Sequence, residues 1–108
     1  KMPLNISMLQ DVKQDIKNNV WQVHLSKTFE RQYSKLSTEI SKRVDSAVNE
    51  LKSSDDPMKL GEPKQGSLKN CFAYEIGNKY RIIYTVYKTE IVILLLKVGK
   101  HKDVYGTD

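Results

Sequence analysis

The sequence predicts an α+β fold in which a helical hairpin covers one face of a mainly antiparallel, four-stranded sheet. Two observations predict this fold. Apolar residues recur at helical spacing through residues 29–51, and three segments rich in β-branched and aromatic residues follow one another closely between residues 71 and 98. Because short connections join antiparallel neighbours, we expect these three segments to form a meander.

The composition fits one small domain. Of the 108 residues, 39% are hydrophobic and 29% are charged, so the chain can bury a modest core and is too apolar for a disordered tail. Its longest apolar run, residues 91–96, is far shorter than the roughly 20 residues of a membrane-spanning helix, and the N-terminus shows no signal pattern. We therefore expect a cytoplasmic protein that does not associate with membranes.

The charge balance favours an anionic partner. The chain carries 18 Lys and Arg residues against 13 Asp and Glu residues, a formal net charge of +5, which fits nucleic acid or an acidic protein. Cys71 is the only cysteine, and this excludes an intrachain disulfide and any metal site built from cysteines. Because His24 and His101 also lie far apart in the sequence, we expect no metal and no other cofactor.

A helix is expected to precede the domain. Residues 7–18 place Leu9, Val12 and Ile16 on one helical face, and Ser7 followed by Gln10 is typical of a capping box. We therefore divide the chain into a helical extension, residues 1–19, and a single globular domain, residues 20–108.

The domain is expected to begin with a strand and a helical hairpin. Residues 20–25 are β-branched or aromatic enough for a strand. Ser26 is a suitable N-cap for the first helix, and Ser37 or Thr38 for the second. The core-facing residues of the two helices are Phe29, Tyr33 and Leu36, then Ile40, Val44, Ala47, Val48 and Leu51.

A long loop and the meander complete the domain. Residues 53–70 contain two prolines and two glycines without periodicity, which indicates a loop. The strand candidates are residues 71–76, 80–87 and 90–98, joined at residues 77–79 and 88–89. Both faces of the second strand are largely apolar and the third is apolar almost throughout, so we expect these two to be central, with the helices on one face of the sheet.

Arg81 is the polar exception in an apolar strand. A lone guanidinium there needs a partner or an aqueous concavity to avoid a large desolvation cost. If residues 88–89 form a two-residue turn, Arg81 lies opposite Leu96. A three-residue connection at 77–79 places Glu75 on its other side, whereas a two-residue connection places Tyr74 there.

This pairing brings Arg81 close to the exit of the last strand. The segment leaving that strand carries Lys100, His101, Lys102 and Tyr105, so a convergent cationic site is expected at this edge of the sheet. The alternative interpretation is a cross-strand ion pair between Arg81 and Glu75 beside a solvated tail.

Cleavage of RNA would use residues of these types. Transesterification needs a base for the 2′-hydroxyl, cations for the charge that gathers on the phosphate, and an acid for the leaving oxygen. Arg81 and Lys100 are suited to the charge and His101 to the acid, because histidine titrates near neutrality. Tyr105 is suited to orient the phosphate or to stack on a base.

Two segments carry a resemblance to a known family. The stretches YEIGNKYRIIYTV and EIVILLLKVGKHKDVY closely resemble the C-terminal half of RelE-type toxins of the RelE/ParE superfamily, and the likeness covers about Val20 to Tyr105. The resemblance implies a twisted sheet under two helices. It also implies a cytosolic mRNA endonuclease that enters the ribosomal A site, cleaves without metal and is neutralised by an antitoxin.

The resemblance also implies roles for individual residues. Arg81 matches the phosphate-binding arginine of the family, and Tyr105 matches the tyrosine that closes its motif. His101 falls where many members have arginine and some have histidine, and the resemblance implies that it acts as the general acid. Ribosome-dependent members often carry two basic residues where this chain has Ala73 and Glu75. A branch resembling YoeB uses a glutamate as base, which makes Glu75 and Glu62 the two alternatives for the base.

The partners follow from the resemblance and the charge pattern. We expect a RelB-like antitoxin with an acidic segment, the ribosome and mRNA, and operator DNA only through the antitoxin complex. The alternatives are a ParE-like inhibitor of DNA gyrase and a catalytically inactive relative that binds its antitoxin. The N-terminal helix is either a structural extension or a mimic of an antitoxin helix. Basic residues expected to contact RNA phosphates are Lys35, Lys42, Arg43, Lys64, Lys69, Lys97 and Lys102.

Overall fold

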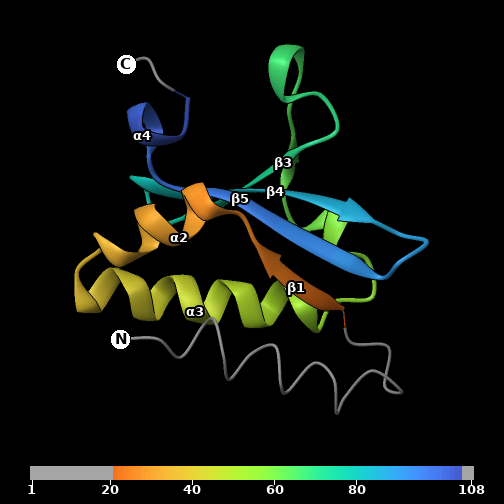
Figure 1. The fold of residues 1–108 in the computed structure, drawn as a ribbon, viewed down its shortest axis with the longest axis horizontal. Helices are drawn as coiled ribbons and strands as arrows, with labels where there is room; N and C mark the ends of the chain where they lie inside the picture. The colour runs from red at the N-terminus through yellow and green to blue at the C-terminus, as the bar shows by residue number, and fades with distance from the viewer. Residues whose placement is uncertain (1–20, 106–108) are drawn as a thin grey trace.

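A five-stranded mixed sheet forms the centre of the molecule, with strand order β1-β5-β4-β3-β2 (Figure 1). The structure is a computed structural model and describes residues 21–105, so the helix predicted at residues 7–18 lies outside the described residues. The elements are β1 (Gln22–Leu25), α2 (Lys27–Ser34), α3 (Thr38–Lys52), β2 (Glu62–Pro63), β3 (Phe72–Ile76), β4 (Tyr80–Tyr87), β5 (Val92–Lys100) and α4 (His101–Tyr105), with single 3₁₀ turns at Pro57–Lys59 (η3) and Gly66–Leu68 (η4).

The predicted fold class is confirmed. The meander β3-β4-β5 is antiparallel, and β1 pairs with β5 in parallel. The sheet has five strands rather than four because the predicted loop contributes β2, in which Glu62 pairs with Ala73 and Pro63 with Phe72. This short edge strand fixes the middle of the loop against the sheet. In the part of the chain that the structure describes, no helix is both long and apolar enough to cross a membrane.

The helical hairpin forms as its caps and apolar residues predict. The Ser26 hydroxyl accepts a hydrogen bond from the Phe29 amide, and the Ser37 hydroxyl accepts one from the Ile40 amide, so Ser37 rather than Thr38 caps α3. Both helices cover one face of the sheet (Figure 1). The fully buried side chains of this core are Phe29, Val44, Val48 and Leu51 from the helices and Val23, Ile82, Tyr84, Ile93, Leu95 and Val98 from the sheet.

The register of the meander differs from the prediction on one side of β4. On the other side, Glu75 pairs with Arg81 as the three-residue connection predicts, and the two-residue alternative is wrong. The predicted pairing of Arg81 with Leu96 is also wrong, because Arg81 lies opposite Gly99. Two causes add up: β4 ends at Tyr87 and β5 begins at Val92, a longer turn than expected, and a register shift between Ile83 and Tyr84 leaves one residue of β5 unpaired.

A second, smaller apolar cluster occupies the sheet face away from the helical hairpin. Ala73, Ile83 and Val104 are buried there, with Cys71, Leu96 and Tyr105 packed against them. The cluster explains why both faces of β4 are apolar, since α4 and the loop around η4 rise above this face while α3 lies below the sheet (Figure 1). The candidate site lies on this second face.

Candidate functional site

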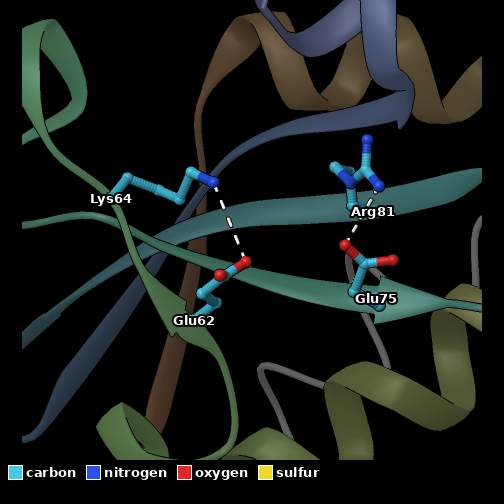
Figure 2. Close-up of polar contacts among 4 residues, drawn as sticks. All are labelled: Glu62, Lys64, Glu75 and Arg81. Carbon is cyan, nitrogen blue, oxygen red and sulfur yellow. Dashed lines mark hydrogen bonds and ion pairs between the residues drawn. The ribbon is translucent and has the colours of Figure 1, made fainter.

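Arg81 is held at the edge of the second apolar cluster by a carboxylate on the neighbouring strand. Its Nη2 donates a hydrogen bond to Glu75 Oε2 at 3.0 Å (Figure 2). The Arg81 side chain is only 14% exposed and the Glu75 side chain 51%. Arg81 Nε is buried and finds no hydrogen-bond partner among the described residues. The guanidinium is therefore incompletely satisfied, because its buried Nε–H has no acceptor within residues 21–105 while its Nη2 is paired with Glu75.

The short helix α4 is folded back over the sheet by a glycine turn and by hydrogen bonds between side chains and backbone groups. Gly99, opposite Arg81, has φ 153°, and a Cβ there would lie 2.8 Å from Asp103 Cβ. Only glycine therefore allows this close turn. The Asp103 carboxylate accepts a hydrogen bond from the Lys100 amide at 3.2 Å, and the Lys97 ammonium donates to the Val104 carbonyl at 3.3 Å.

Gln32 of α2 also holds α4 in place, through hydrogen bonds to the end of β5 and to α4 itself. Its Oε1 accepts a hydrogen bond from the Val98 amide at 2.9 Å, and its Nε2 donates to the Asp103 carbonyl at 3.0 Å. One side chain thus joins α2, the end of β5 and α4. Neither Gln32 nor Asp103 was predicted from the sequence. The signal for Gln32 was a glutamine next to the apolar stripe of the helix, three residues after Phe29 and directly before Tyr33.

Tyr105 lies at the centre of the site, because its ring contacts three of the candidate side chains. Its ring makes an edge contact with the His101 ring at 4.5 Å between centroids. The Lys64 ammonium lies 5.3 Å and the Arg81 guanidinium carbon 5.8 Å from the centre of the Tyr105 ring. Both are within cation–π range, so the aromatic ring joins two cations that come from different strands or loops.

The conformation of the predicted loop, residues 53–70, places Lys64 next to the Tyr105 ring. The buried Tyr84 hydroxyl donates a hydrogen bond to the Pro57 carbonyl at 2.7 Å, and burial raises the pKa of Tyr84 above its ordinary value. A Cβ at Gly61 would meet the Tyr84 oxygen at 2.5 Å, so the loop needs glycine to pass this closely. Beyond β2, the Lys64 amide donates to the Cys71 carbonyl at 3.0 Å, and its ammonium lies 3.9 Å from Glu62 Oε1 (Figure 2).

The structure brings together most of the residues proposed from the sequence. Arg81, Glu75, His101 and Tyr105 form one cluster with Lys64 and Glu62, and Lys100 and Lys102 line a hollow together with Arg81 and His101. Lys97 lies beneath α4. Lys35 and Arg43 lie on the side of the helical hairpin, and Lys42 and Lys69 are exposed outside these hollows.

Three neighbouring hollows extend the cationic surface around the end of the sheet. Lys100 lines all three: one holds Arg81 and His101, a second Arg43 and Lys79, and a third Arg31 and Lys35. Among the described residues that line them, Asp103 is the only acid. The positive charge is therefore continuous from the Arg81 cluster to the C-terminal end of α2, where cations also complement the helix dipole.

Comparison with known proteins identifies the family. The family model of the ParE-like toxin of type II bacterial toxin-antitoxin systems matches residues 23–107. The chain belongs to this family. A search of curated proteins finds no match. The predicted resemblance to RelE/ParE-superfamily toxins is thus confirmed, and the chain is a type II toxin of this superfamily.

Solved structures of toxins share the fold. The RelBE2 toxin-antitoxin complex from Mycobacterium tuberculosis matches 76% of this chain and 99% of its own, with 24% identity and a TM-score of 0.57. The isolated Escherichia coli RelE toxin matches 81% and 92%, with 18% identity and a TM-score of 0.60. YafQ from E. coli matches 80% and 99%, with 12% identity and a TM-score of 0.65. At these identities the likeness establishes the fold.

Proposed function

We propose that this toxin is a ribosome-dependent mRNA endonuclease that cleaves by attack of the RNA 2′-hydroxyl on the adjacent phosphate. The observation that carries the proposal is the Arg81 guanidinium, which is mostly buried and incompletely hydrogen-bonded, lies against the Tyr105 ring that Lys64 also contacts, and lines a hollow together with His101. A preorganised cation of this kind stabilises the charge that develops on a phosphate in the transition state.

The remaining steps use neighbouring side chains. A carboxylate accepts the proton of the 2′-hydroxyl, the 2′-oxygen forms a bond to phosphorus, and the bond from phosphorus to the 5′-oxygen breaks. Protonated His101 gives its proton to the departing 5′-oxygen, which leaves a 2′,3′-cyclic phosphate and a 5′-hydroxyl. Arg81 and Lys100 carry the phosphate charge, and Tyr105 orients the phosphate or stacks on a base.

Two glutamates are the candidates for the base. Glu62 pairs with Ala73 on the site face and lies beside the Lys64 ammonium, while Glu75 contacts Arg81. We expect either Glu62→Gln or Glu75→Gln to lower the rate of cleavage at saturating substrate by 10²-fold or more, the size of a lost general base. Full cleavage by both variants would eliminate this assignment.

The decisive test is primer extension on mRNA translated by programmed ribosomes. Wild-type toxin should produce cuts in the A-site codon, and Arg81→Ala should reduce them by about 10²-fold or more. Tyr105→Phe, run in parallel, separates a role of the hydroxyl from one of the ring. Lys88→Ala, a charge deletion at the opposite end of the sheet, is the control and should cleave normally.

The same test addresses the two alternative functions. A folded toxin that leaves mRNA intact and causes gyrase-dependent DNA damage would be a ParE-like gyrase inhibitor. A toxin that does neither, yet binds its antitoxin, would be an inactive relative. The replacement of the strand cations by Ala73 and Glu75 is the feature that would account for lost cleavage.

We also propose a cytoplasmic location and an antitoxin partner that resembles RelB and contributes an acidic segment. The RelBE2 complex of M. tuberculosis and the YoeB-YefM complex of Staphylococcus aureus each pair a related fold with a second protein. Operator DNA would be bound only through the antitoxin, and ribosomal RNA and mRNA through the basic residues around the Arg81 cluster. Co-purification of the toxin with the product of an adjacent gene tests the antitoxin.

A further inference from the structure

The pair formed by Arg81 and Glu75 joins a fixed cation to a freer anion. Arg81 lies between β3 and β5 in the interior of the meander, and its side chain is 14% exposed. Glu75 lies on β3 near the turn at residues 77–79, and its side chain is 51% exposed. A carboxylate with this exposure can be rehydrated when it leaves its partner, whereas the guanidinium cannot leave the cluster without losing its contact with Tyr105.

Glu75 is also the only acid in contact with Arg81 in the range 21–105. A second glutamate on this face, Glu62, lies beside the Lys64 ammonium instead. Lys64 and Arg81 both contact the Tyr105 ring, and each of these cations already has an anion before any RNA arrives, as the two ion pairs in Figure 2 show. A phosphate that approaches Arg81 meets both the positive charge of the guanidinium and the negative charge of Glu75.

We propose that Glu75 is a built-in competitor of the substrate phosphate, which fills part of the phosphate subsite of Arg81 in the free toxin and must move aside when RNA binds. This inference rests on the proposed function, because it takes Arg81 as the phosphate ligand. The carboxylate holds the guanidinium in place before binding and lowers the affinity for RNA. Like charges at hydrogen-bond distance from one guanidinium repel each other, and breaking the ion pair opposes phosphate binding.

The role as competitor and the role as base leave different signatures. A base acts on the rate at saturating substrate, whereas a competitor acts on the affinity for a strand that cannot react. The test therefore measures the binding of the full-length toxin to a fluorescein-labelled single-stranded RNA in which every 2′-hydroxyl is methylated. Anisotropy is recorded for wild type, Glu75→Gln, Arg81→Gln and the double variant.

Glu75→Gln is expected to bind this RNA about three- to tenfold more tightly than wild type, because glutamine keeps the shape and removes the charge. The gain should fall to that of the control Glu39→Gln in the Arg81→Gln background. Glu39 is an exposed acid of the first turn of α3 on the opposite side of the sheet, so its substitution reports the effect of net charge alone. Thermal unfolding of each variant verifies that the fold is retained.

Unchanged or weaker binding by Glu75→Gln overturns the inference, and so does a gain of equal size in the presence and absence of Arg81. If Arg81→Gln itself leaves RNA affinity unchanged, the proposed function fails as well, because Arg81 then makes no contact with the phosphate. Tighter binding together with intact cleavage assigns Glu75 as competitor and leaves Glu62 as the base. Tighter binding with lost cleavage assigns both roles to Glu75.

Discussion

The site depends on a few residues whose replacement no neighbour can compensate, and Gly99 is one of them. It pairs with Arg81 at the end of β5 and reverses the chain into α4, which carries His101 and Tyr105. Its φ of 153° and the 2.8 Å approach of an added Cβ to Asp103 Cβ leave no room for a side chain. The direction of α4, and with it the place of Tyr105 over the Arg81 cluster, therefore depends on one missing methyl group.

Gly99→Ala is expected to displace α4 and to lower mRNA cleavage by at least tenfold. Its free energy of unfolding should fall by about 1–3 kcal/mol, the usual cost of forcing an alanine into positive φ with a steric clash. Gly66→Ala is the matched control, because Gly66 also has positive φ, 69°, but an added Cβ there meets nothing within 4 Å. Urea denaturation and primer extension measure both quantities. Equal cleavage by the two alanine variants would contradict the steric argument.

At the scale of elements, the sequence predicted the parts of the site that depend on periodicity and missed those that depend on single irregularities. Alternation along β4 and the three-residue connection placed Glu75 beside Arg81, as found. The pairing with β5 was wrong because neither the longer turn nor the unpaired residue opposite Ile83 and Tyr84 leaves a periodic signal. The two-residue strand β2 was missed for the same reason.

Long-range contacts made by polar side chains were equally invisible in the sequence. The pattern that placed Phe29 and Tyr33 in the core gave no partner for Gln32, which bonds to residues 66 and 71 positions away. Lys64 was predicted as one of several RNA-binding lysines, and only the folded loop places it at Tyr105. The polar residues at and after the strand ends thus predicted where the site lies. The tertiary structure determines which of these side chains contact one another.

Gln32→Leu is expected to loosen α4 while α2 remains folded. The substitution leaves the amide of the buried Val98 without its acceptor, so the free energy of unfolding should fall by about 1–3 kcal/mol. Cleavage should fall at least tenfold, and amide exchange at Val104 and Tyr105 should accelerate more than exchange in β4. Gln22→Leu, on β1, is the control for the same change of side chain. Normal protection of α4 in Gln32→Leu would show that Gln32 does not hold it.

At the scale of the whole molecule, one face of the sheet packs against the helical hairpin and forms the main core, and the other face carries the candidate site. The helical hairpin buries aromatic rings whose hydroxyls are tied to acids or carbonyls: Tyr33 donates to Asp45, Tyr74 to Glu50 and Tyr84 to Pro57. Burial, followed by the Glu50 contact, raises the pKa of Tyr74 to about 12. Burial also raises the pKa of Tyr33 and of Tyr84, and Asp45 adds to the effect on Tyr33.

The toxin is therefore expected to lose stability steeply above pH 10. An unfolded tyrosine titrates near 10, so between pH 10 and 12 the folded state binds more protons than the unfolded state, and the free energy of unfolding decreases as pH rises. Each such tyrosine contributes a slope of up to about 1.4 kcal/mol per pH unit. Urea denaturation at pH 9, 10 and 11 measures the slope, and Tyr33→Phe should reduce it. Phenolate absorbance that appears near pH 10 in all tyrosines of the folded toxin would contradict this.

The face that carries the Arg81 cluster and the adjoining end of the sheet together form the continuous cationic surface on which RNA binding is proposed. Arg31 and Lys35 lie at its far end, in the hollow that shares Lys100 with the Arg81 cluster. An RNA strand long enough to reach both ends of this surface should release counterions at both ends. The binding of an RNA strand that covers only the Arg81 cluster should not depend on Arg31 and Lys35.

Replacing Arg31 and Lys35 together by alanine is expected to weaken binding of a long uncleavable RNA, while a trinucleotide binds as before. Each lost phosphate contact on a single strand lowers the slope of log K against log salt by roughly 0.7, so the double variant should lose about 1.4. The control replaces Lys59 and Lys88, exposed lysines of the loop and of the β4-β5 turn, and removes the same charge. Fluorescence anisotropy at 50–300 mM salt measures the slopes. If both double variants lose the same slope, the charge acts diffusely; if the trinucleotide also weakens, the far hollow acts on the Arg81 cluster itself. Either result would separate Arg31 and Lys35 from the path of the RNA.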